Sequence, residues 1–304
     1  MYNSIIIGSG PAGLTAAIYL ARADLRPLII AGIPYGGQLM GTTEIENFPG
    51  FENGILGPQL IQNMLSQAKR FGAEVVFENV KNINFQEKPF KINTNKQTYE
   101  SKTIVIATGA EPRKLGLEGE ARLWGKGVSS CATCDGAFYR EKIVAVAGGG
   151  DSAMEESNFL TKFAKKVYLI HRRDQFRASK IMADRAINNP KIEIIYNTEI
   201  KDVLGEDKVE KLLLYNNKTN ENSQLPVDGF FLAIGHNPVT GLFKDQLEMK
   251  ENGYLIKKHN THSSVEGVFI AGDVEDQRYR QAITAAADGC KAAIDCEKYL
   301  SETN

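Results

Sequence analysis

The sequence has little cysteine, almost no excess of charge and no long apolar run. The formal net charge of −1 gives no overall field that would attract nucleic acid or an anionic membrane surface. No apolar stretch approaches the ~20 residues needed to span a bilayer. The opening "MYNSIIIGSG" is short and lacks the basic leader of a signal peptide. We therefore expect a cytoplasmic protein without nucleic-acid or membrane partners.

The four cysteines are unevenly placed, since Cys131 and Cys134 stand close together in "SSCATCDG". Structural disulfides are rare in the cytoplasm, so a close pair indicates catalysis, redox sensing or metal binding. The remaining composition, 42% hydrophobic and 24% charged, is typical of a soluble globular protein with a large core. A length of 304 residues suits one large domain or two ordinary ones.

The first thirty residues predict a strand, a glycine-rich turn, a helix and a second strand. In the turn "GSGPAG", Gly8 permits a tight bend and Gly10 lets the backbone approach a pyrophosphate. Gly13 lets the helix pack closely on the strand, with its N-terminus facing the phosphates. The acid that usually follows the second strand is missing, because that strand runs into Ala31 and Gly32. A plain glycine-rich turn is the alternative interpretation.

The same pattern recurs in "KIVAVAGGGDSAMEESNFLTKFAKKVYLIHRR", where Gly148, Gly150 and Ala153 form the accepted G-x-G-x-x-A variant. After its second strand come His171, Arg172 and Arg173, then Arg177. Arginines at this place suit the 2′-phosphate of NADP, and two charge-assisted bonds would favour NADPH over NADH by about a hundredfold or more. The alternatives are a solvated basic patch and a nucleic-acid contact.

Two further segments, "TIVIATGAEP" and "GFFLAIGHNP", each predict a last strand with a proline-containing exit. We therefore predict an α/β fold of two Rossmann-like, three-layer dinucleotide-binding domains. One domain comprises residues 1–112 and 242–304, and the other, residues 113–241, is inserted in it through two hinge-like linkers. The returning segment predicts a strand, Asp273 and a helix starting near Tyr279. The polar stretch 216–224 predicts a hairpin tip without a functional role.

Spacing favours a redox dithiol at Cys131 and Cys134. Zinc is the rival, but it needs four ligands, and Cys290 and Cys296 lie six residues apart on different faces of a predicted helix. His259 and His262 fit a polar turn better than a metal site. A dithiol with two nucleotide sites indicates electron flow through a flavin, so we expect FAD in the first domain and NADPH in the second. Asp135 would move the proton or cap a helix.

The motifs "GSGPAG", "GGQL" with "IENFPG", "SSCATCDG", "GGGDSA" with "HRRDQFR", and "AGDV" with "YRQA" follow in this order along nearly the whole chain. Together they resemble the bacterial-type, low-molecular-weight thioredoxin reductases, which are class II pyridine nucleotide-disulfide oxidoreductases. The most specific part is "CATC" inside the predicted NADPH domain. These reductases share the missing acid after the first turn, so the resemblance removes that objection.

The resemblance implies a homodimeric, NADPH-dependent flavoenzyme that reduces thioredoxin, with domain rotation between half-reactions. Cys134 would be the flavin-proximal sulfur and Cys131 the one that attacks the partner disulfide. The implied FAD residues are Gly8, Ser9, Gly10, Pro11, Ala12, Gly13, Ala31, Gly32, Gly36, Gly37, Gln38, Asn47, Thr108, Gly109, Asp273, Arg280, Gln281 and Ala282. The implied NADPH residues are Gly148, Gly150, Asp151, Ser152, Ala153, His171, Arg172, Arg173 and Arg177. A reductase of a glutaredoxin-like or peroxidase-linked protein is the alternative, and a non-enzymatic redox or zinc regulator is a more remote one.

Overall fold

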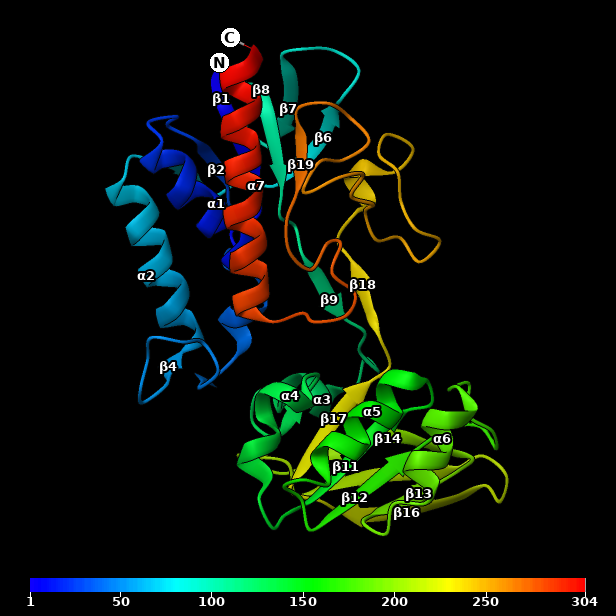
Figure 1. The fold of residues 1–304 in the computed structure, drawn as a ribbon. Coiled ribbons are helices and arrows are strands. Elements are labelled where there is room, and N and C mark those ends of the chain that lie inside the picture. Colours follow the sequence, from blue (N-terminus) through cyan, green and yellow to red (C-terminus); the bar gives the residue numbers. More distant parts are fainter. Residues whose placement is uncertain (304) are drawn as a thin grey trace. The chain divides into compact units, whose positions relative to one another are not determined.

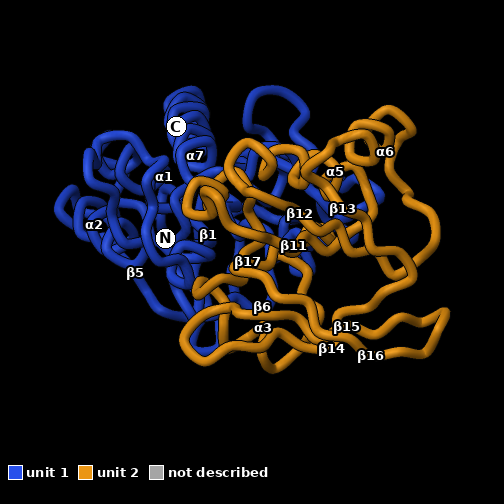
Figure 2. Tube along the Cα trace, turned by 90° about the horizontal axis from the view of Figure 1, so that it is seen from below, with its two compact units in different colours: residues 1–111, 237–304 blue, residues 112–236 orange. Residues whose placement is uncertain are grey.

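A computed structural model describes residues 1–303 and divides the chain into two compact units (Figures 1 and 2). Unit 1 comprises Met1–Glu111 and Asn237–Asn304, and unit 2 comprises Pro112–His236. The chain passes between the units through β9 (Ala110–Pro112) and β18 (His236–Pro238), which pair with each other. Unit 2 is therefore one continuous segment, whereas unit 1 is built from both ends of the chain.

Unit 1 is built on a seven-stranded sheet in the order β5-β2-β1-β8-β7-β6, with β19 also paired to β8. Its strands are β1 (Tyr2–Ile7), β2 (Leu28–Ile30), β5 (Glu74–Val76), β6 (Val80–Asn84), β7 (Phe90–Thr94), β8 (Thr98–Ile106) and β19 (Val268–Ile270). The pairs among β5, β2, β1, β8 and β19 are parallel. The apolar run Ile5–Ile7 in β1 is buried throughout, as expected for a parallel strand covered on both faces.

Three longer helices complete unit 1, and Figure 1 shows α7 (Ala282–Thr303) running alongside α1 (Pro11–Arg22). A Cβ at Gly289 of α7 would lie 2.0 Å from the Ala12 carbonyl oxygen, so this glycine permits the close packing of the two helices. The remaining elements are α2 (Gly57–Arg70), the 3-10 turns η1 (Gly37–Gly41) and η3 (Gly241–Phe243), and the short strands β3 (Glu44–Ile45) and β4 (Ile55–Leu56).

The helix expected from Tyr279 begins instead at Ala282. The Asp276 carboxylate accepts hydrogen bonds from the amides of residues 278–280, and Arg280 has a left-handed backbone with φ of 47°. A left-handed residue cannot continue a right-handed helix, so the segment before Ala282 stays a turn.

Unit 2 has a five-stranded parallel sheet in the order β10-β17-β11-β12-β13 and a three-stranded antiparallel sheet, β14-β15-β16. The parallel strands are β10 (Val128–Ser129), β11 (Ile143–Gly148), β12 (Lys166–Ile170), β13 (Ile192–Ile195) and β17 (Gly229–Ala233). The antiparallel strands are β14 (Thr198–Leu204), β15 (Lys211–Asn216) and β16 (Glu221–Pro226), and the turn between the last two confirms the predicted hairpin tip. The helices are α3 (Glu118–Arg122), α4 (Ala132–Asp135), η2 (Gly136–Tyr139), α5 (Asp151–Leu160) and α6 (Lys180–Ile187).

Each unit has its own apolar core on both faces of its parallel sheet. The fold is thus mixed α/β, as the alternation of apolar strands and helices predicts. None of the helices in residues 1–303 is long and apolar enough to cross a membrane.

Candidate functional site

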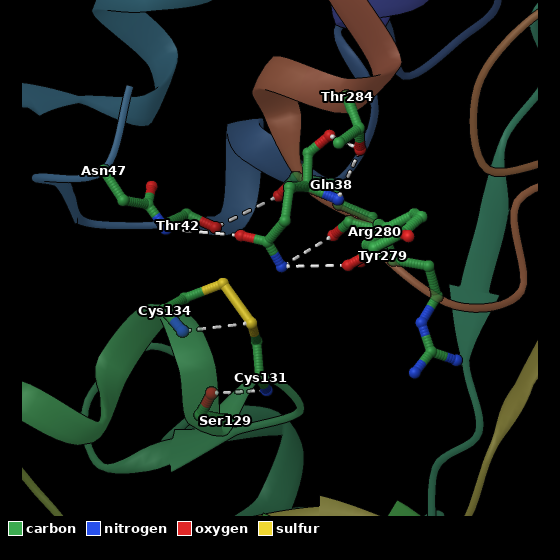
Figure 3. Close-up of a disulfide and its surroundings, with 10 residues drawn as sticks. Gln38, Thr42, Asn47, Ser129, Cys131, Cys134, Tyr279, Arg280 and Thr284 are labelled. Carbon is green, nitrogen blue, oxygen red and sulfur yellow. Dashed lines mark hydrogen bonds between the residues drawn. A yellow bond between two sulfur atoms is a disulfide. The ribbon is translucent and has the colours of Figure 1, made fainter. Parts of the chain in front are cut away.

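Cys131 and Cys134 form a disulfide at the short helix α4, with their Cα atoms 5.3 Å apart (Figure 3). Cys131 occupies the position just before the helix, and its amide donates to Ser129 Oγ at 3.0 Å. The Cys134 amide donates to Cys131 Sγ at 3.2 Å. A donor aimed at this sulfur stabilises negative charge on Cys131 when the pair is reduced. The two cysteines that stand close together in the sequence therefore form a disulfide, which is the oxidised form of the predicted redox dithiol.

Asp135 lies at the end of α4, directly after the disulfide. Burial raises the pKa of its carboxyl, and a hydrogen bond with Ser129 opposes part of that rise. Asp135 occupies the N-cap position of η2, as the alternative predicted, but its side chain makes no capping hydrogen bond to that turn. A carboxyl with a raised pKa beside a redox pair can hold and release a proton as the sulfurs change charge.

The other two cysteines are free thiols on α7. Cys296 is buried, its sulfur lies 3.1 Å from Thr103 Oγ1, and burial raises the pKa of the thiol to about 11. A thiol with so high a pKa is rarely ionised at neutral pH and is a poor nucleophile. Within residues 1–303, no three His, Cys, Asp or Glu side chains gather in a way that could hold a metal.

In unit 1 the first glycine turn has the expected strain and the expected open space. A Cβ on Gly8, whose φ is 111°, would lie 2.2 Å from the Ala107 carbonyl oxygen, and one on Gly13 would lie 2.1 Å from the Gly8 oxygen. A Cβ on Gly10 would meet nothing within 4 Å. Gly10 precedes α1, and no side chain in the described part of the chain caps this helix. Its first amides are available to a phosphate.

Ser9, between the two glycines, is buried and serves the turn rather than a ligand through its hydroxyl. Its Oγ donates to the Ala31 carbonyl at 2.7 Å and accepts from the Gly36 amide at 2.8 Å. This bond network joins the end of β2 and the segment before η1 to the glycine turn. A Cβ on Gly37 would lie 3.5 Å from the Gly10 Cα, so η1 begins beside the open position.

The segment after β19 carries Asp273, whose Oδ1 is buried and has no hydrogen-bond partner among residues 1–303. Burial, and then the neighbouring Asp276, raise the pKa of this carboxyl to about 7, while Arg280 opposes the rise. A buried acceptor without a donor is costly, so it marks a place where a ligand hydroxyl would be stabilising. A Cβ on Gly272 would lie 2.9 Å from the Ala12 Cβ, which places this segment against the first turn of α1.

Four further polar side chains that the resemblance assigns to FAD make hydrogen bonds within unit 1: Gln38, Asn47, Thr108 and Gln281. Asn47 Nδ2 donates to Gln281 Oε1 at 3.3 Å, and Gln281 Nε2 donates to the carbonyls of Tyr279 and Arg280 at 3.1 and 3.2 Å (Figure 3). Gln38 Nε2 donates to the Ala110 carbonyl at 2.5 Å, and Thr108 Oγ1 donates to the Val239 carbonyl at 2.7 Å. The structure thus joins Asn47 and Gln281, which are 234 residues apart in sequence.

The second glycine turn, in unit 2, repeats this geometry between β11 and α5. A Cβ on Gly148 would lie 2.5 Å from the Ala153 Cβ and 2.6 Å from the Ala233 carbonyl oxygen, and one on Gly150 would meet nothing within 4 Å. A Cβ on Gly149 would lie 2.2 Å from the His171 ring. Gly149 was not among the predicted site residues, although it is the middle glycine of "GGG" and stands between two that were.

His171 lies under the turn rather than on the surface. Its ring is buried, and its Nε2 lies 3.0 Å from the Gln175 carbonyl oxygen. Burial lowers the pKa of the imidazole, and the charges of Arg173 and Arg177 lower it further. His171 is therefore neutral at pH 7 and adds no charge for a phosphate. Arg172, Arg173 and Arg177 are all exposed and can do so.

Comparisons with known proteins agree with this geometry. The family model described as "Pyridine nucleotide-disulphide oxidoreductase" matches residues 2–289. Thioredoxin reductase of Streptomyces coelicolor is 52% identical over 302 residues, which is 98% of this chain and 94% of that protein. The crystal structure of thioredoxin reductase from Streptococcus pyogenes is 43% identical with a TM-score of 0.95, and 99% of each chain is covered. The chain belongs to the low-molecular-weight thioredoxin reductases.

A second solved thioredoxin reductase, from Lactococcus lactis and described as the FR conformation, is 39% identical over 99% of this chain and 100% of that one. Its TM-score is only 0.66. Membership in the thioredoxin reductases implies FAD and NADPH as cofactors. The residues present fit both: the open Gly10 and the unpaired Asp273 Oδ1 suit FAD, and the open Gly150 with the exposed arginines suits NADPH.

Proposed function

We propose that two electrons pass from NADPH through FAD to the Cys131–Cys134 disulfide and from there to the disulfide of thioredoxin. The observation that carries this proposal is a bonded cysteine pair in the unit that also holds the second glycine turn. FAD, when bound, accepts a hydride equivalent from NADPH and can pass both electrons to a disulfide. The curated relatives are named thioredoxin reductases, and we assign the same activity to this chain.

In this proposal the two units bind different nucleotides. The FAD-binding domain is 1–112 with 242–304, and the inserted domain 113–241 binds NADPH. Support comes from the glycine turn of each unit and from the exposed arginines that follow β12, whereas β2 is followed by Ala31 and Gly32. The FAD and NADPH residues implied by the resemblance stay predictions, with Ser9 and His171 acting through the hydrogen bonds described above.

The two cysteines have different roles. In the reduced pair, the Cys131 thiolate attacks the partner disulfide, forms a mixed disulfide and displaces one partner thiolate, which takes a proton. Cys134 then loses its proton, attacks the Cys131 sulfur, restores the intramolecular disulfide and releases the second partner thiol. The Cys134 amide supports charge on Cys131, and the carboxyl of Asp135 is suited to exchange the protons.

A rotation of the units about β9 and β18 would let one disulfide meet both FAD and a whole protein. The two solved relatives above support a chain whose parts move, since at 43% and 39% identity their TM-scores are 0.95 and 0.66. We further propose that the enzyme is a homodimer and acts in the cytoplasm. Thiol reduction by NADPH suits that compartment, where thiols are kept reduced.

The assignment is tested by Cys131→Ser and Cys134→Ser. Each should abolish thioredoxin reduction, while NADPH still bleaches the flavin absorbance, because hydride transfer to the flavin precedes thiol chemistry. Cys290→Ser, which removes a free thiol on α7, is the matched control and should leave both steps intact. Near-normal turnover of thioredoxin by either of the first two variants would show that the pair is not the electron carrier.

A further inference from the structure

The two glycine turns differ in charge at the helix that follows each of them. The first turn of α1 has no acidic residue, whereas α5 begins with Asp151. An acid at a helix N-terminus suits the helix dipole, but it repels a pyrophosphate bound at the same place. The Asp151 carboxylate is therefore unsuited to bind the pyrophosphate itself, and its hydrogen bonds to the protein indicate its role.

Residues 172–179 carry the three arginines, and we call them the arginine segment. Asp151 is hydrogen-bonded to the C-terminal end of this segment. Its Oδ1 accepts from the Ser179 amide at 2.7 Å and from Ser179 Oγ at 3.0 Å. Two residues earlier, the Gly149 carbonyl accepts from the amides of Arg177 and Ala178 at 2.7 and 3.2 Å. Four hydrogen bonds thus tie residues 177–179 to residues 149–151. We call this set of bonds the 151–179 clamp.

The N-terminal end of the segment is held by other contacts. The Arg172 carbonyl accepts from Asn217 Nδ2 at 2.8 Å, and the Arg173 carbonyl accepts from the Asn197 amide at 3.1 Å. In the middle, the Phe176 ring lies 5.3 Å from the His171 ring and 5.0 Å from the Tyr196 ring, centroid to centroid. At the other end, the Arg177 amide is held by the Gly149 carbonyl, and Ser179, two residues further on, is held by Asp151.

We infer that Asp151 is a positioning residue for NADPH selectivity: its carboxylate holds Ser179 and so fixes Arg177 beside the glycine turn. The inference rests on the proposed role of the arginines. Without the two bonds from Asp151, the clamp keeps only its two bonds to the Gly149 carbonyl. The ligand must then order more of the segment around Arg177, and the cost of that ordering weakens binding. The loss falls on ligands with a 2′-phosphate, because only they use the arginines.

The test is calorimetric titration of the FAD-loaded protein with 2′,5′-ADP and with 5′-AMP. Asp151→Ala should weaken 2′,5′-ADP by about tenfold, the effect of losing hydrogen bonds to a charged acceptor, and 5′-AMP by less than about twofold. Asp151→Asn keeps an oxygen acceptor for Ser179 and should bind both ligands like the parent. Asp174→Ala removes an exposed carboxylate of the same segment and is the matched control.

Amide hydrogen exchange gives a readout independent of ligand. In Asp151→Ala, peptides covering residues 175–181 should exchange faster, while those of β11 should not change. Equal weakening by Asp151→Asn and Asp151→Ala would show that charge matters and not the clamp. Equal weakening of the two ligands, or unchanged exchange, would also overturn the inference.

A second pair of variants separates this inference from the proposed function. If Arg172→Ala with Arg173→Ala leaves the affinity for 2′,5′-ADP unchanged, the proposed arginine site itself is wrong. If that pair weakens 2′,5′-ADP and Asp151→Ala does not, the arginine site stands and only the clamp is refuted.

Discussion

The buried carboxyl of Asp273 makes the stability of the FAD-free protein depend on pH. The pKa of this group is about 7 in the folded chain, against 3.8 for an ordinary aspartate. A raised pKa means that folding disfavours the ionised form, so the penalty is absent below about pH 4. It grows as the pH rises and is complete above about pH 7. Asp273→Asn removes the ionisation and should remove this pH dependence.

The size of the effect follows from the shift. One pKa unit corresponds to about 1.36 kcal/mol, so a shift of about three units amounts to roughly 4 kcal/mol. Asp273→Asn also leaves a buried amide without a partner, but that cost does not change with pH. The free energy of unfolding of the variant, minus that of the parent, should therefore rise by roughly 4 kcal/mol between pH 4 and pH 8.

Urea unfolding of the FAD-free protein, followed by circular dichroism at several pH values, measures this difference. Asp245→Asn is the control, because Asp245 is an exposed aspartate of the same unit. Its difference from the parent should stay flat with pH. A flat difference for Asp273→Asn as well, within about 1 kcal/mol, would refute the argument from burial.

Two further predictions concern the nucleotide and the motion. Arg172→Ala with Arg173→Ala should raise the KM for NADPH by about a hundredfold and change that for NADH little, as steady-state kinetics would show; equal effects would mean that the arginines serve the fold. A crosslink that fixes the two units in a disulfide-on-flavin pose should stop both thioredoxin turnover and flavin reduction by NADPH, whereas one in the opposite pose should stop only turnover. Unimpaired turnover in fully crosslinked protein would end the rotation model.

Much of the fold was predictable because each unit is built from apolar strands and glycine turns, which can be recognised from short stretches of sequence. The run "SIIIGSG" is a buried strand followed by a strained turn, and Gly8 and Gly13 are needed for the reasons that the spacing predicts. The start of α7 was not predictable in this way. It depends on the Asp276 carboxylate and on the left-handed backbone of Arg280, and composition reveals neither.

The residues of the candidate site also fall into two groups, those whose chemistry the sequence shows and those whose surroundings only the structure shows. The two cysteines lie close to each other in the sequence, and so do the three arginines, so the sequence alone indicated the chemistry of each group. The burial of Asp273 and the hydrogen bonds of Ser9 and His171 were not visible there, because tertiary packing decides what surrounds those side chains.

The polar stretch 216–224 makes a contact that could not be predicted from the sequence. Its composition predicts a hairpin tip, which is confirmed, while the expectation that it has no functional role stays a prediction. Asn217, at the tip, donates to the Arg172 carbonyl, so the antiparallel sheet of unit 2 helps to hold the arginine segment. Gly149 and Asp151 at one end and Asn217 at the other thus hydrogen-bond to a segment of which only the arginines were conspicuous in the sequence. In the proposed site, selectivity should depend on these backbone contacts as well as on charge, because a guanidinium on an unordered loop binds at the cost of ordering that loop.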